Sequence, residues 1–268
     1  DVANFYARYT QAQYETYMAQ YLGEDMWSNE GESGETYETS VKESILESLE
    51  NMYLLEDHME EYEITVSDEE KQKIADAAAE FVEANDEADA KKVSGSQETV
   101  ERALTLITIQ HKVADAIMDT ADTEVSDEEA AQKKMQYVKF SFTTTDDDGN
   151  SVDLTDEEKE TLKQEAEDFA EGVKDAKDFS EYATENSLEA QEATFDAEST
   201  SYDTALIEAA DALEEGGVTG LVEGTDGYYV AKVTSLFDEE ATSQKKEEII
   251  SQRQSEKYNE VLDGWRED

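Results

Sequence analysis

The 268-residue sequence contains no cysteine and no proline, and only two histidines. Without cysteine there is no disulfide, no thiolate nucleophile and no cysteine-based zinc site. Because proline is absent, although its average usage is about 5%, the chain has no slow prolyl step in its own folding. The lack of cysteine suits an exported protein from a cell that avoids thiols outside the cytoplasm, but many cytosolic proteins share it.

Basic residues are scarce: 21 Lys and Arg stand against 71 Asp and Glu, which gives a formal net charge of −50. We expect no binding to nucleic acid or anionic lipid, because like charges repel. Calcium and basic or unfolded cationic segments are compatible partners, and the acids also form a solubilising surface. No run of 18 apolar residues occurs, so we expect no membrane span; an export signal or lipid-bearing cysteine would lie upstream of Asp1.

The candidates for a metal site are weak. His58 and His111 lack a ligand spacing, and we expect His111 to be a tethered core or boundary residue on an apolar helix. The acidic turn Asp146–Asn150 would need Asp at 144 and Glu at 155 to form an EF-hand loop, and threonine stands at both positions. No Gly-rich phosphate loop occurs. We therefore predict no metal and no cofactor, and a calcium-stabilised acidic surface protein is a third-ranked interpretation.

Both ends of the chain carry the pattern of helices, because apolar residues recur three, four or seven positions apart. We predict helices from this pattern at residues 4–22, 36–60, 97–121 and 242–265. Ser/Thr-Asp-Glu-Glu segments are capping boxes and predict further helix starts, at residues 67–70, 126–129 and 155–158. The helix at 97–121 is the most apolar, which indicates either burial between partner helices or an exposed apolar cradle.

The pattern changes near Gln136. Tyr137–Thr143 alternates with a period of two, which predicts a half-buried strand. Two helices, a brief strand, a helix, a strand and a hairpin strand then follow, at 155–173, 178–183, 194–195, 206–213, 218–222 and 228–233. The predicted fold class is α+β, mostly α. A discontinuous all-helical domain comprises residues 1–134 and the C-terminal helix 236–268, and a module with a four-stranded sheet plus helices is inserted at 135–235.

This module resembles a parvulin-type peptidyl-prolyl isomerase domain. Asp178–Ala183 is similar to the family's Asp-Phe-x-x-Leu-Ala, and Leu206–Leu213 is similar to Phe-Glu-x-Ala-Ala-Phe-Ala-Leu. Gly217–Thr219 is similar to Gly-Glu-Val-Ser, offset by one. The flanks resemble the chaperone halves of PrsA/SurA-type foldases, with an aromatic first helix, Ser-Asp-Glu-Glu helix starts and a returning C-terminal helix. The resemblance covers nearly the whole chain and rests on the order of these motifs.

The resemblance also places the family's site positions on this chain. The first-strand histidine falls on Phe140, the Cys or Asp after the second helix on about Glu189, and the last-strand histidine on Tyr229. By strand alternation we expect Phe140 and Tyr229 to lie together beneath an open groove. The expected substrate-binding residues are Phe140, Phe195, Tyr202, Leu206 and Tyr229.

The resemblance implies an extracytoplasmic folding factor, either a cell-surface lipoprotein or a secreted protein, that binds unfolded or extended polypeptides of exported proteins. Because both family histidines are replaced, we predict weak or lost isomerase activity, and the sequence leaves open whether the chain is an enzyme. The alternative, from another functional class, is a non-enzymatic surface binding module for one specific partner. A homodimer is left open as well.

Overall fold

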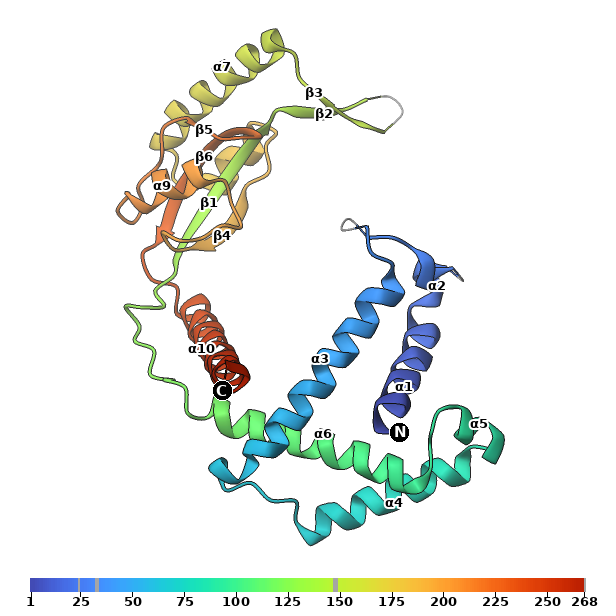
Figure 1. Ribbon diagram of the computed structural model, residues 1–268. Helices are drawn as coiled ribbons and strands as arrows, with labels where there is room; N and C mark the ends of the chain where they lie inside the picture. The colour runs from blue at the N-terminus through green and yellow to red at the C-terminus, as the bar shows by residue number, and fades with distance from the viewer. Residues whose placement is uncertain (24, 32–33, 147–148, 268) are drawn as a thin grey trace. The chain divides into compact units, whose positions relative to one another are not determined.

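The computed structural model describes residues 1–23, 25–31, 34–146 and 149–267, and it divides into two compact units (Figure 1). The first unit comprises Asp1–Asp122 and Gln252–Asp268, and the second comprises Thr123–Ser251. The predicted module at 135–235 lies inside the second unit, and its bounds stay a prediction. The predicted fold class is confirmed: the chain is mostly helical and carries one four-stranded antiparallel sheet among its described residues.

The first unit is built from helices. They are α1 (Val2–Tyr17), α2 (Ala19–Leu22), α3 (Tyr37–His58), α4 (Asp68–Ala84), α5 (Glu87–Lys92) and α6 (Gln97–Met118), with 3₁₀ turns η1 (Met26–Ser28) and η2 (Met59–Tyr62). The last helix, α10 (Glu239–Glu267), contributes its C-terminal part. The capping box predicted at Ser67 starts α4. The short helix α5 was not predicted.

Helix α6 is the centre of this unit and packs against α1, α3 and α4. Its buried side chains recur three or four positions apart, at Val100, Ala103, Leu106, Ile109, Val113 and Ile117. Burial between partner helices is therefore the role of this apolar helix. Leu262 of α10 packs in the same cluster as Ile109 and Val113 of α6.

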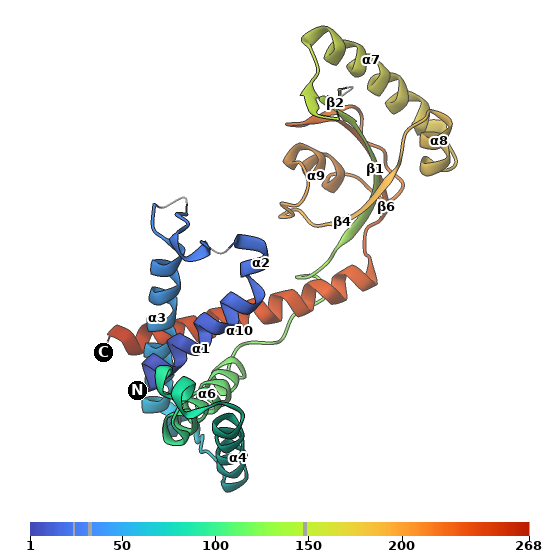
Figure 2. The same ribbon diagram turned by 90° about the vertical axis from the view of Figure 1, so that its right-hand side faces the viewer.

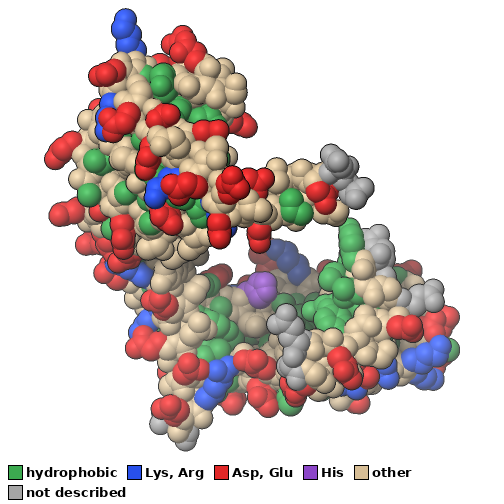
Figure 3. Space-filling model, turned by 90° about the horizontal axis from the view of Figure 1, so that it is seen from above, with side chains coloured by type: hydrophobic (Ala, Val, Ile, Leu, Met, Phe, Trp, Pro, Cys, Tyr) green, Lys and Arg blue, Asp and Glu red, His purple; other side chains and the backbone are tan. Residues whose placement is uncertain are grey.

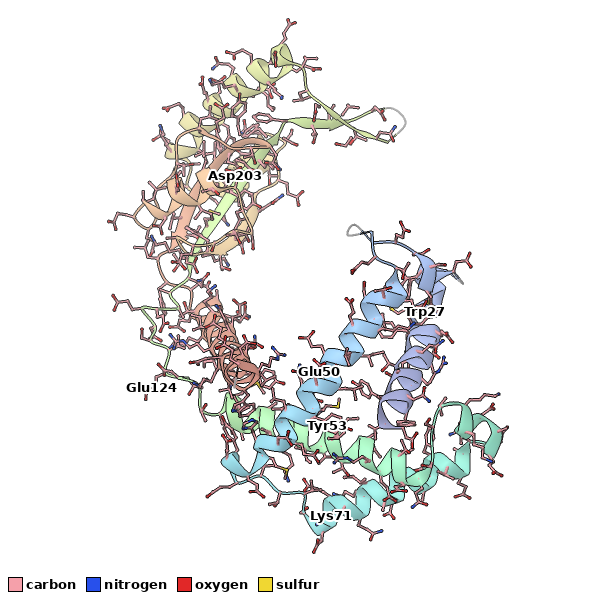
Figure 4. The ribbon with its side chains drawn as sticks, in the orientation of Figure 1. Trp27, Glu50, Tyr53, Lys71, Glu124 and Asp203 are labelled. Atoms are coloured by element: carbon pink, nitrogen blue, oxygen red, sulfur yellow. The ribbon has the colours of Figure 1, made fainter. Side chains whose placement is uncertain are left out.

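Aromatic side chains fill the space between α1 and α3. The Trp27 ring, labelled in Figure 4, stacks on Tyr37 at 5.7 Å between centroids and meets the edge of Tyr14 at 6.2 Å. Edge-to-face and offset-stacked rings add to the stability that their burial supplies. The N-terminal aromatic stripe is thus partly core, whereas Tyr17 and Tyr21 farther along are 67% and 78% exposed.

Two local predictions in the helical regions are wrong. Ser126–Glu129 forms a turn instead of a helix start, although the Glu129 N–H still donates to the Ser126 hydroxyl at 3.1 Å. The residues after this capping box do not continue the apolar pattern of a helix, and strand β1 begins soon after them, at Lys133. His111 is exposed, because it lies off the buried stripe of α6. In the acidic turn at 146–150, Asp147 and Asp148 lie outside the described residues.

The second unit contains the sheet. Its strands are β1 (Lys133–Ser141), β4 (Gln191–Phe195), β5 (Val222–Glu223) and β6 (Gly227–Ser235), in the antiparallel order β4-β1-β6-β5. A separate hairpin joins β2 (Thr143–Thr145) to β3 (Ser151–Asp153). Its helices are α7 (Asp156–Gly172), α8 (Phe179–Glu185), α9 (Thr204–Asp211) and the N-terminal part of α10, with the 3₁₀ turn η3 (Val173–Asp175). The capping box predicted at Thr155 starts α7.

Helices cover the two faces of this sheet differently. Helices α7 and α8 pack on one face, against Val138, Phe140, Tyr228 and Val230, and α9 packs on the other, against Met135, Phe195 and Tyr229 (Figure 2). We call these the α7 face and the α9 face. Side chains alternate between the faces along each strand, so consecutive residues such as Tyr228 and Tyr229 belong to different cores.

No helix among the described residues has both the length and the apolar character that crossing a membrane requires. Acidic side chains are scattered over the face of the molecule seen in Figure 3, with fewer lysines and arginines among them.

Candidate functional site

A pocket of about 480 Å³ opens on the α9 face of the second unit. It is lined by Tyr137, Lys139, Gln191, Ser201, Tyr202, Asp203, Leu206, Thr225, Asp226 and Tyr229. The residues come from β1, β4, β6, the start of α9 and the turn between β5 and β6. The lining therefore combines three phenol rings and one leucine with a lysine and two carboxylates.

Strand pairing decides which residues reach this pocket. Tyr229 lies opposite Lys139, and Phe140 lies opposite Tyr228. Directly opposed residues of an antiparallel pair point to the same face. Lys139 and Tyr137, two positions earlier, therefore share the α9 face with Tyr229. The rings of Tyr137 and Tyr229 lie 6.3 Å apart, and the Lys139 ammonium lies 5.8 Å from the centre of the Tyr229 ring.

The prediction that Phe140 and Tyr229 lie side by side is wrong. Phe140 is buried in the α7 face, where its ring packs edge-on against Phe169 at 5.9 Å. Because the side-chain period of a strand is two, an assignment that is off by one residue transfers a side chain to the opposite face. On β1 the ring that neighbours Tyr229 belongs to Tyr137.

Asp226 joins the side chains at one end of the pocket. The Tyr229 hydroxyl donates to its Oδ1, and the Lys139 ammonium donates to its Oδ2 at 2.5 Å. The hydrogen bond from Lys139 is the largest cause that holds the pKa of Asp226 below its ordinary value. Burial raises the pKa of Tyr229, and its hydrogen bond to Asp226 raises it further. At neutral pH the pair is therefore a phenol and a carboxylate.

Asp203 fixes the wall that faces Tyr229. One of its oxygens accepts from the Ala205 N–H at 2.9 Å and caps α9, and the other accepts from the Thr225 N–H and hydroxyl at 2.7 and 2.8 Å. The Thr225 N–H is the largest cause that lowers the pKa of Asp203. Figure 4 labels this residue. A single carboxylate thus ties the start of α9 to the turn that precedes β6.

Only glycine fits at position 224 in this turn. A Cβ on Gly224 would lie 2.6 Å from Cε2 of Tyr229 and 2.8 Å from Cγ of Asp203. Real Cβ atoms essentially never approach other heavy atoms so closely, so a side chain here must displace one of these residues. The backbone of residue 224 therefore packs directly on the pocket wall.

Tyr137 and Tyr202 form the other end of the pocket. Tyr137 lies opposite Gln191 in the sheet, and its hydroxyl donates to the amide oxygen of Gln191 at 2.5 Å. Burial raises the pKa of the Tyr137 phenol. The Tyr202 ring meets the Tyr137 ring edge-on at 6.1 Å. These contacts orient the two phenols across the pocket.

The structure brings most of the predicted site residues together. Tyr202, Leu206 and Tyr229 line the pocket, and Phe195 is fully buried behind it in the same core cluster. Glu189 does not line it; this residue is exposed in the loop between α8 and β4. Phe140 belongs to the α7 face, as described above.

Sequence reasoning missed Tyr137, Lys139, Gln191, Asp203 and Asp226. Two signals could have found some of them. Tyr137 and Lys139 are two positions apart on β1, so their side chains point to the same face of the sheet. Asp203 is an N-cap residue directly before the apolar run of α9. Among the described residues, no group of three His, Cys, Asp or Glu side chains is arranged to hold a metal ion.

Comparison with protein families gives one match: residues 143–249 match the model of the PPIC-type PPIase domain. This match confirms the predicted parvulin-type module in the chain. No curated protein matches the sequence.

Solved structures similar to this chain include three foldase or chaperone structures. The foldase protein PrsA from Streptococcus pneumoniae is 21% identical, with 85% of this chain and 87% of that chain covered and a TM-score of 0.33. PrsA from Bacillus cereus, described as a peptidylprolyl isomerase, is 18% identical, with 88% and 90% covered and a TM-score of 0.35. A structure from a study of two SurA-like chaperones of Campylobacter jejuni is 16% identical, with 85% and 86% covered and a TM-score of 0.32.

Proposed function

We propose that this chain is a protein-folding factor that works outside the cytoplasm and binds unfolded or extended polypeptides of exported proteins. The observation that carries the proposal is the pocket on the α9 face. Most of its lining residues belong to the segment that matches the PPIC-type PPIase family. Its three aromatic rings offer a surface on which a side chain or a proline ring of an extended peptide can pack.

The chemistry of the pocket favours binding over catalysis. Rotation about a prolyl amide bond needs no covalent nucleophile, since its barrier of about 18–20 kcal/mol reflects amide resonance. Hydrogen-bond donors aimed at the amide can lower this barrier. Each phenol has one O–H proton, which Tyr229 donates to Asp226 and Tyr137 donates to Gln191. Two of the three phenols, Tyr137 and Tyr229, therefore donate to a bound peptide only by breaking an internal hydrogen bond, and we propose that isomerase activity is weak or lost.

A prolyl-peptide isomerisation assay tests the enzymatic part. We expect the full chain to leave the rate close to that of the buffer. The matched variant is Tyr202→Ala, because Tyr202 is only half-buried and its truncation spares the core residue Leu206. A rate well above that of buffer in the native chain, reduced in this variant, would show that the pocket is a working isomerase site.

An aggregation assay with an unfolded client protein tests the folding-factor part. We expect the full chain to slow client aggregation at stoichiometric amounts. Because the proposal rests on the pocket, excess prolyl peptide should remove much of this protection. Protection that persists in excess peptide would mean that clients contact another surface, and no protection at all would refute the chaperone proposal.

The internally bonded phenols also favour an alternative, a non-enzymatic surface module that recognises one specific partner. Recovery of a single stoichiometric partner from an extracytoplasmic extract would favour this module. A folding factor should instead retain many unfolded chains of unrelated sequence.

A further inference from the structure

The hydrogen-bond acceptors in the pocket on the α9 face are already used within the protein. Both carboxylate oxygens of Asp203 and both of Asp226 accept hydrogen bonds from neighbouring protein groups. The amide oxygen of Gln191 accepts from the Tyr137 hydroxyl. A peptide N–H group that enters the pocket must therefore share an acceptor with a donor of the protein.

Tyr202 differs from the other two phenols of the pocket. The hydroxyls of Tyr137 and Tyr229 donate within the protein. The hydroxyl of Tyr202 has no hydrogen-bond partner among the residues that the structure describes. Because a phenol has one O–H proton, Tyr202 is the phenol of this pocket that can donate to a ligand without losing an internal hydrogen bond.

The position of Tyr202 is fixed by its neighbours. Its ring meets the Tyr137 ring edge-on at 6.1 Å, and the next residue, Asp203, caps α9 and accepts from the Thr225 N–H at 2.7 Å. Burial raises the pKa of Tyr137, and the repulsion between its ionised form and that of Tyr202 raises it further, so the two phenol oxygens share one part of the pocket. A donor that is held in place loses little freedom when a ligand binds.

A proline-containing segment matches a pocket that offers a donor and has its acceptors engaged. Proline has no backbone N–H, so it brings no donor that needs an acceptor. The carbonyl groups on the two sides of its ring each present an acceptor oxygen. Both carbonyl carbons are bonded directly to ring atoms, so these oxygens enter the pocket together with a proline ring that packs on the phenols.

We propose that the Tyr202 hydroxyl donates a hydrogen bond to a backbone carbonyl oxygen next to the bound proline. The inference rests on the proposed peptide-binding function of the α9 face and specifies how that site selects its substrate. The contact reads the prolyl backbone and not the flanking side chains, so the pocket accepts extended prolyl segments of unrelated sequence.

This contact is consistent with binding without catalysis. Amide resonance gives the C–N bond its double-bond character and places negative charge on the carbonyl oxygen. A donor on that oxygen favours the planar amide, so it contributes to binding rather than to rotation.

A conservative variant and a matched pair of peptides test the contact. The probes are two fluorescent prolyl peptides of the same sequence; in one of them, sulfur, a weaker acceptor, replaces both carbonyl oxygens next to the proline ring. Their affinities for the full chain are measured by anisotropy. We expect Tyr202→Phe, which keeps the ring and removes the hydroxyl, to bind the oxygen peptide about fivefold more weakly, the loss of one neutral hydrogen bond. The sulfur peptide should bind the native chain and the variant equally.

Tyr182→Phe is the matched control. It removes a hydroxyl from another half-buried tyrosine of the second unit, which packs against Phe169 at 5.2 Å on the α7 face. This variant should bind both peptides as the native chain does. A loss equal to that of Tyr202→Phe would overturn the contact, because removal of a hydroxyl outside the pocket would then have the same effect.

The remaining outcomes separate the contact from the proposed function. Equal binding of the oxygen peptide by the native chain and Tyr202→Phe would overturn the contact and leave peptide binding intact. Equal weakening of both peptides in Tyr202→Phe would also overturn it, because the loss would not depend on the carbonyl oxygen. Absence of binding of either peptide to the native chain would overturn the proposed peptide-binding function and the contact with it.

Discussion

The two faces of the sheet in the second unit use the same strands for different purposes. On the α7 face, Phe169 packs edge-on against Phe140 and against Phe179, each at 5.9 Å between centroids, in a buried apolar core. On the α9 face, Phe195 and Leu206 are buried at one end, while tyrosines, a lysine and carboxylates line a pocket at the other. The difference teaches that one face supplies stability, which lets the other face keep polar groups for binding.

Truncating a buried side chain on the α7 face should have the largest effect on stability. Phe179 is 1% exposed, and we expect Phe179→Ala to lower the free energy of unfolding of the second unit by about 3–5 kcal/mol. Tyr202→Ala on the α9 face should lower the free energy of unfolding by no more than about 1 kcal/mol, because the ring is only half-buried. Urea unfolding followed by circular dichroism measures both. Equal costs would mean that the α9 face carries as much of the stability as the α7 face.

Adding a methyl group to the α9 face at residue 224 should affect both stability and binding. We expect Gly224→Ala to cost about 1–3 kcal/mol of stability by overpacking, since its Cβ meets Tyr229 and Asp203. Displacement of these side chains should weaken prolyl-peptide binding by about tenfold, which corresponds to 1.4 kcal/mol.

Gly220→Ala is the control for this substitution, because a Cβ there meets nothing within 4 Å. It should leave both stability and peptide affinity close to those of the native chain. If the two variants bind peptide equally well, the wall formed by residue 224 is not part of the binding site.

Acid should slightly weaken the contacts that Asp226 and Asp203 make on the α9 face. The pKa values of Asp226 and Asp203 are lowered by folding, so their contribution to stability is present above the unfolded pKa of about 3.9. It is lost as pH falls through the lower, folded-state pKa. The Asp226 side chain is 59% exposed, so we expect only a few tenths of a kcal/mol.

Unfolding measured across the acid range checks this prediction. The native chain should lose more stability than Asp226→Asn as the pH falls below about 4, because the loss begins near the unfolded pKa and continues through the lower, folded-state pKa. If the variant shows the same pH dependence as the native chain, the bonds from Lys139 and Tyr229 to Asp226 do not stabilise the fold.

The sequence predicted the order of the elements better than the residues of the site. Capping chemistry is local, so the boxes at Ser67 and Thr155 correctly marked helix starts where an amphipathic run follows. The same box at Ser126 precedes a strand and forms only a turn. A cap therefore predicts a helix only together with the periodicity that buries one side of it.

The site depends on pairing between distant segments, which periodicity does not specify. Alternation correctly grouped Phe140 with Val138, and Tyr229 with Ala231, on common faces of their own strands. It does not say which group of one strand meets which group of the other. That choice is made by the register that sets Lys139 opposite Tyr229, and a change of one residue would reverse it.

The placement of Trp27 and Trp265 has a practical optical consequence. They are the only two tryptophans in the sequence, and both belong to the helical unit. Trp27 is stacked on Tyr37, and Trp265 is stacked on His58 at 4.1 Å. Indole emission therefore reports on the helical unit alone, and the pocket is visible only through its tyrosines. Unfolding of the helical unit can therefore be followed in the native chain by indole emission, without any attached label.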